Sequence, residues 1–96
     1  MEEKIGVKHD SDKLRYDLMP PEVLQSVVQV LTNGAKKYAD NNWKDVPDSD
    51  NRYYAAAMRH LQAWRMGELL DAEDGLPHLS HAVCCLSFLL YKQIEK

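Results

Sequence analysis

Two segments with helical apolar spacing, on either side of a short acidic stretch, constrain the fold of this chain most. Apolar or aromatic residues recur every three or four positions from Asn51 to Met66, and again from Pro77 to Lys96. This spacing places side chains along one stripe of an α-helix. The stripes are Tyr53, Ala57, Leu61 and Trp64 in the first segment, and Leu79, Val83, Leu86 and Leu90 in the second. The sequence therefore predicts two neighbouring, antiparallel helices.

The stretch from Gly67 to Gly75 is expected to be the turn between these helices. Gly67 is placed to end the first helix, and Pro77 suits the first turn of the second, where its missing N–H would be unpaired anyway. Asp50 is the expected cap of the first of these two helices. An earlier helix is predicted to begin at Pro21, with Glu22 favourable to its N-terminal dipole. Its apolar stripe consists of Val23, Val27, Val30 and Leu31.

These patterns predict one all-α domain over residues 1–96, with an extended arm over 1–19 and three main helices over about 21–37, 50–66 and 77–95. The arm is expected to pack against the body of the molecule through its apolar side chains. Those side chains are Leu14, Tyr16, Leu18 and Met19. Three short helices leave apolar surface uncovered, so we expect a homo-oligomer to complete the helical bundle.

The composition limits the possible classes of protein. With 45% hydrophobic and 28% charged residues, the chain is typical of a soluble globular protein. A net charge of −3 gives no support for duplex nucleic acid as a partner. No apolar run approaches the roughly 18 residues that span a bilayer. The adjacent Cys84 and Cys85 are expected to be reduced packing residues, and the cytoplasm is the expected location.

The stretch from Arg59 to His81 holds three of the four histidines together with several acids. His78 and His81, three residues apart, share one helical face, and an antiparallel hairpin brings His60 toward them. Imidazoles with carboxylates suit a divalent metal. The candidate metal ligands are His60, Glu68, Asp71, His78 and His81, and the candidate catalytic acids are Glu68, Asp71 and Glu73. The alternative is that the histidines are structural and the acids belong to a solvated loop.

A second group of residues suits a nucleotide. Lysine and arginine side chains bind phosphate oxygens, whereas aromatic rings stack on bases and amides read base edges. The phosphate candidates are Lys36, Lys37, Arg52 and Arg59, and the base candidates are Tyr38, Asn42 and Trp43. Alternatively, the lysines complement a helix dipole, Trp43 packs in the core and the arginines are solvated.

The segments DKLRYDLMPPEVL, GAKKYADNNW, YYAAAMRHLQAW, GELLDAEDG and PHLSHAVCCLSFLL resemble, in this order, the N-terminal domain of the phage dATP/dGTP diphosphohydrolase family. The resemblance covers roughly residues 8–90. That family is related to the MazG-like all-α nucleoside triphosphate pyrophosphohydrolases. The resemblance implies metal-dependent cleavage of dGTP or dATP to the monophosphate and pyrophosphate. It also implies a role in phage nucleotide metabolism, in the host cytoplasm.

The chain departs from the MazG-like pattern at the metal ligands. It has no EExxE motif, although GELLD supplies an ExxD as Glu68 and Asp71. His78 and His81 stand where the last helix would present its acidic pair. Either the metal is borderline rather than hard, such as Mn²⁺ or Zn²⁺, or the site has been rebuilt. The expected cofactor is a divalent metal, Mg²⁺ or Mn²⁺, with Zn²⁺ and Co²⁺ as the alternatives that the histidines suggest. Two rival functions are a non-catalytic protein that sequesters nucleotides or nucleotide signals, and a helical interaction module without a ligand.

Overall fold

The computed structural model describes residues 4–95, and it is helical. Its elements are η1 (Tyr16–Leu18), α1 (Pro21–Lys37), η2 (Asn42–Asp45), α2 (Ser49–Arg65) and α3 (His78–Glu95). The prediction of an all-α fold with three main helices is confirmed. The structure begins α2 at Ser49, so Asp50 lies inside the first helical turn and the expectation that Asp50 caps this helix was wrong. α3 begins one residue after Pro77.

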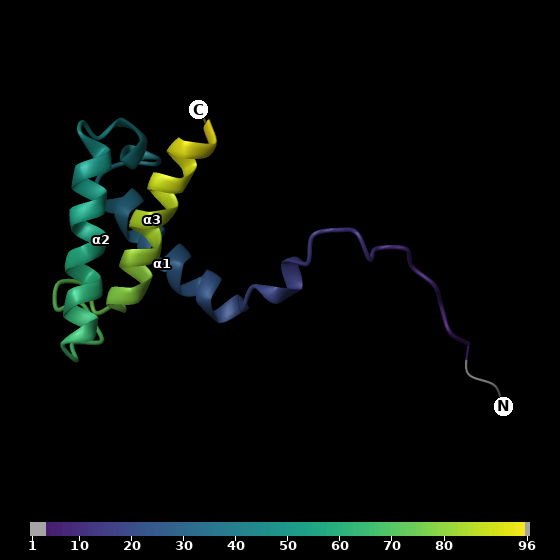
Figure 1. Ribbon diagram of the computed structural model, residues 1–96. Helices are drawn as coiled ribbons and strands as arrows, with labels where there is room; N and C mark the ends of the chain where they lie inside the picture. The colour runs from purple at the N-terminus through teal and green to yellow at the C-terminus, as the bar shows by residue number, and fades with distance from the viewer. Residues whose placement is uncertain (1–3, 96) are drawn as a thin grey trace.

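Helix α3 is the centre of the arrangement, because it packs against both α2 and α1 (Figure 1). The longer contact is with α2. Small side chains are almost fully buried there, with Ala57 and Ala82 both 2% exposed. Small residues at a helix–helix contact let the two backbones approach closely. Cys84 and Cys85 are also buried, and burial raises the pKa of the Cys84 thiol to about 12, so it packs as a neutral group.

Large apolar residues of α3 lie on the opposite side, away from both neighbouring helices. We call this stripe the outer face; its exposed fractions run from 40% to 73%. It consists of Leu79, Val83, Leu86, Leu90 and Ile94. The stripe of α2 is likewise only partly covered, since Trp64 is 38% exposed. The chain therefore buries its small residues and leaves many of its large apolar ones open.

The described part of the N-terminal arm, residues 4–19, extends away from the helices (Figure 1). The expectation that it packs against the body was wrong: Leu14 is 81% exposed and Tyr16 is 82% exposed. The contacts of α1 with α3 involve Ser26, whose hydroxyl bonds that of Ser80, and Val27, whose carbonyl accepts from the Cys84 thiol at 3.5 Å. The first turn of α1 is exposed, so the arm leaves from a free helix end.

Within residues 4–95, no helix is both long enough and apolar enough to cross a membrane.

Candidate metal centre and adjoining clefts

The connection between α2 and α3 is a tight loop that sets the two helices antiparallel. Gly67 and Gly75 have φ angles of +99° and +73°, a region that glycine adopts without strain. An antiparallel bridge joins Leu70 to Pro77, and the His78 N–H donates to the Leu69 carbonyl at 3.0 Å. The C-terminal end of α2 is thereby held beside the N-terminal end of α3.

Two aspartates of this loop are oriented by backbone N–H groups. Asp71 Oδ1 accepts from the Glu73 N–H at 2.8 Å, and Asp74 Oδ1 accepts from the Leu76 N–H at 2.9 Å. These are Asx turns, in which a side chain stabilises its own loop. In each aspartate the other oxygen, Oδ2, lies within ion-pair distance of a histidine. The loop therefore presents two carboxylate oxygens in fixed directions before any ligand arrives.

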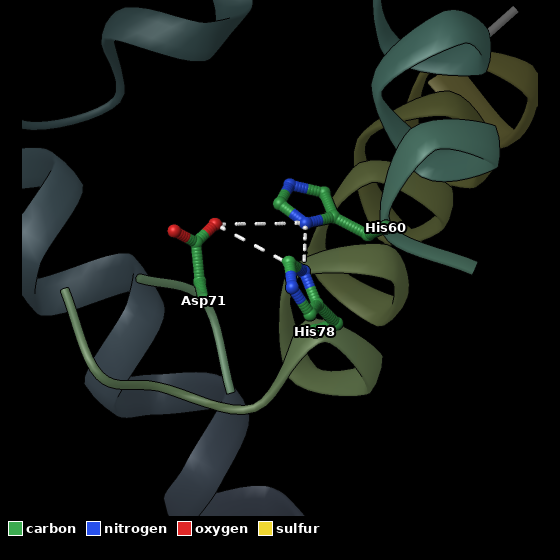
Figure 2. A group of neighbouring side chains, drawn as sticks. All are labelled: His60, Asp71 and His78. Atoms are coloured by element: carbon green, nitrogen blue, oxygen red, sulfur yellow. Dashed lines mark hydrogen bonds and ion pairs between the residues drawn. The ribbon is translucent and has the colours of Figure 1, made fainter. Parts of the chain in front are cut away.

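His60 of α2, Asp71 of the loop and His78 of α3 point toward one another (Figure 2). The two Nδ1 atoms are 2.9 Å apart, and Asp71 Oδ2 is 3.8 Å from that of His60 and 4.0 Å from that of His78. A triangle with these edges has a centre about 2.1 Å from every corner, which is the bond length of Zn²⁺ or a similar ion to nitrogen and oxygen ligands. The three residues therefore fit a divalent ion.

His60 is half-buried, and its surroundings favour the neutral imidazole that suits metal binding. Burial is the main cause that lowers the pKa of His60, and the neighbouring His81 and His78 lower it further. A neutral imidazole is the form that ligates a metal. The side chain of His78 is 8% exposed, and its Nε2 lies 3.5 Å from Glu68 Oε1. Within residues 4–95 this nitrogen makes no hydrogen bond, so Glu68 lies near it without fixing the ring.

His81 belongs to the same cluster. Its ring stacks on that of His60 with a centroid distance of 4.6 Å and an interplanar angle of 11°. Its Nε2 lies 2.8 Å from Asp74 Oδ2. Asp74 is not among the residues that the sequence patterns indicated. The Asp-Gly pair at positions 74 and 75, a turn signal in the acidic loop, was the available clue.

A cleft of about 650 Å³ connects this cluster with the base candidates. It lies between the C-terminal half of α1, η2, α2 and α3. Its lining includes Tyr38, Asn42 and Trp43 together with His81. A neighbouring cleft of about 600 Å³ is lined by Tyr38 and Asn42 again, and by Arg52 and Arg59. Both volumes lie within the range that small-molecule sites usually have.

The other catalytic, phosphate-binding and base-binding candidates lie outside the group of His60, Asp71 and His78. Glu68 and Glu73 have side chains 54% and 77% exposed, and Glu73 accepts from Lys37 Nζ at 3.2 Å. That contact raises the pKa of Lys37. Lys36 is exposed in the last turn of α1. Trp43 stacks on Phe88 at 4.5 Å and meets Tyr91 edge-on at 5.1 Å, which gives it a packing role within the cleft wall.

The fold and the site define an all-α protein with a histidine–aspartate cluster beside a ligand-sized cleft. The family model for the N-terminal region of dATP/dGTP diphosphohydrolases matches residues 3–96, and the chain belongs to this family. No curated protein and no solved structure was found to match the chain.

Proposed function

We propose that this protein hydrolyses a purine deoxynucleoside triphosphate, dGTP or dATP, to the monophosphate and pyrophosphate with the help of a divalent metal. The observation that carries the proposal is that one cleft is lined both by the base candidates and by His81 of the histidine–aspartate cluster. Membership of the dATP/dGTP diphosphohydrolase family supports the choice of substrate. The resemblance to phage enzymes supports a role in phage nucleotide metabolism, in the host cytoplasm.

The metal ligands would be His60, Asp71 and His78. Two nitrogens and one oxygen favour a borderline ion such as Mn²⁺, Co²⁺ or Zn²⁺ over Mg²⁺, which prefers oxygen. When bound, the ion supplies positive charge that stabilises the negative phosphoryl oxygens. Water attacks the α-phosphorus, the bond from this atom to the bridging oxygen breaks, and pyrophosphate leaves. Glu68 and Glu73, the acids outside the triad, are candidates for positioning the water.

The phosphates of a nucleotide require cationic side chains, and its base requires a planar side chain on which to stack. Arg52 and Arg59 line one cleft with Tyr38 and Asn42, so the arginines can reach phosphate while these two residues contact the nucleoside. The ring of Tyr38 is the better stacking platform, because the residue is 63% exposed whereas Trp43 stacks on Phe88. Lys37 is a weaker phosphate candidate, since it is paired with Glu73.

We also propose that the protein acts as a homo-oligomer. Support comes from the outer face of α3, where five large apolar side chains are exposed in the single chain. Monomeric proteins rarely leave contiguous apolar patches of this kind uncovered.

The test is a chromatographic product assay on metal-stripped protein, given each of the four deoxynucleoside triphosphates with Mg²⁺, Mn²⁺, Co²⁺ or Zn²⁺, or with no metal. We expect dGTP or dATP to yield the monophosphate and pyrophosphate only when an ion is present. Absence of turnover with every pair, at stoichiometric protein, would overturn the enzymatic proposal. Stoichiometric nucleotide binding that persists in EDTA and gives no product would establish the sequestering protein instead.

Two substitutions tie the activity to the cluster. Asp71→Asn and His81→Ala are expected to lower turnover by about 100-fold or more while helical circular dichroism is kept, because preorganised charge contributes effects of this order. The matched control is Asp50→Asn, which removes one exposed carboxylate in the first turn of α2, at the opposite end of the helix from His60. Full activity in both cluster variants would show that the reaction takes place elsewhere.

A further inference from the structure

The histidine–aspartate cluster contains a second set of ligands beside the first. Asp71, Asp74 and His81 each offer one ligand atom, and these atoms all lie within 4.8 Å of one another. Asp71 therefore belongs to this set and to the set with His60 and His78. Two groups of three ligands that share a carboxylate are the arrangement of a two-metal site, in which one aspartate bridges the ions.

The ligand atoms of His81 and Asp74 lie as close together as two neighbouring ligands of one ion. Nε2 and Oδ2 are 2.8 Å apart, and the buried Nε2 has no hydrogen-bond partner in the part of the chain that the structure describes. Neighbouring ligands of an octahedral ion at about 2.1 Å lie about 3 Å from each other. The same close approach occurs in the first set, between the two Nδ1 atoms at 2.9 Å. Each set thus has one ligand-like pair, and Asp71 is common to both.

The surroundings hold these ligands in place. The His81 ring is stacked on His60, which limits its rotation. Asp74 Oδ1 is engaged by the Leu76 N–H, so Oδ2 is the oxygen that faces His81. Asp71 Oδ1 accepts from the Glu73 N–H, which orients its carboxylate in the same way. Hydrogen-bonded carboxylates of this kind are typical of metal sites.

We propose that Asp71, Asp74 and His81 bind a second divalent ion, so that the protein has a two-metal centre bridged by Asp71. This inference rests on the proposed metal dependence, and it assigns Asp74 a role. With two oxygens and one nitrogen, the second set is the more oxygen-rich and suits Mn²⁺ or Mg²⁺. Because His81 also lines the 650 Å³ cleft, the second ion is the one nearer to a bound nucleotide.

The experiment uses the full chain, stripped with a chelator and titrated with Mn²⁺ alone, with no nucleotide. Loss of the free-ion signal in electron paramagnetic resonance gives the stoichiometry, and we expect two ions per chain. The frozen sample should show the exchange-coupled spectrum of two manganese ions that share a ligand. A single ion per chain, or two ions without coupling, would overturn the bridged centre.

Asp74→Asn keeps the amide oxygen that accepts from Leu76 and removes the negative ligand. We expect this variant to bind one Mn²⁺ with an uncoupled spectrum, whereas Asp50→Asn binds two like the natural chain. An unchanged coupled spectrum in Asp74→Asn would contradict the role of Asp74. If no Mn²⁺ binds to the natural chain, both the proposed metal dependence and the two-metal centre are wrong. If one Mn²⁺ binds and turnover is intact, only the proposed second ion is wrong.

Discussion

The inner and outer faces of α3 carry side chains of different size, and apart from Phe88, which packs on Trp43 and Tyr53, the most buried side chains are small or polar. The inner side buries small and polar residues: His78, Ser80, Ala82, Cys84 and Cys85. The outer side exposes leucine, valine and isoleucine. A helix that served only the stability of its own chain would turn the larger residues inward. The inner side is therefore shaped by close packing and the histidine–aspartate cluster, and the outer side is the surface at which we propose that a second copy of the chain binds.

A charge on the outer face should give the largest effect. Leu86→Lys is expected to convert a homo-oligomer into monomers, because a lysine cannot be buried at an apolar contact without a partner. Light scattering after gel filtration measures the change. Binding of Mn²⁺ to the separated chains should be kept, since all proposed ligands come from one chain.

The matched variant for that measurement is Gln62→Lys, which places the same charge on an exposed position of α2. It should leave the oligomer intact. A natural chain that is monomeric at high concentration would show that the outer face is not an interface between copies.

Enlarging a small residue on the inner side should have a moderate effect. Ala82 is 2% exposed, so Ala82→Leu forces α3 away from α2 and should cost about 1–3 kcal/mol of unfolding free energy. Urea unfolding at a fixed protein concentration measures it. Val83→Leu, one residue along on the outer face, is made in the Leu86→Lys background, where the separated chain leaves this position 40% exposed, and should cost much less than Ala82→Leu in the same background. Equal costs at both positions would remove the distinction between the two sides.

The smallest effect expected is on the pH dependence of the metal-free protein. The pKa of His60 is lowered in the folded chain, so below about 6.5 the unfolded chain takes up a proton before the folded one does. Stability from this residue is present above that pH and is lost as the pH falls toward the lowered value. Urea unfolding midpoints between pH 7.5 and 5.5 measure this loss of stability, and the loss should be smaller in His60→Gln.

The control for this titration is His9→Gln, a change in the exposed arm, which should leave the pH dependence as it is. If His60→Gln also leaves the dependence of the urea midpoint on pH unchanged, burial of His60 is not the cause of that dependence.

The fold and much of the candidate site follow from sequence patterns, because both depend on short-range spacing. Helical periodicity located the three helices, and the separation between His78 and His81 indicated one shared face. Asp74 was missed because its direction depends on an Asx turn in the loop, which periodicity does not describe. The arm was misjudged for another reason: apolar residues indicate that a segment needs a contact, but they do not indicate which chain supplies it.

The position of α1 against α3 has a consequence for how the chain folds during synthesis. The α2–α3 hairpin joins residues that are close in sequence, such as His60 and His78, so it closes after a short search. The contacts of α1 pair Ser26 with Ser80 and Val27 with Cys84, more than fifty positions later. Thus α1 leaves the ribosome before α2 and α3, and it is the last of these three helices to find its place. During that interval its valine-rich stripe is open to solvent, to chaperones and to neighbouring nascent chains.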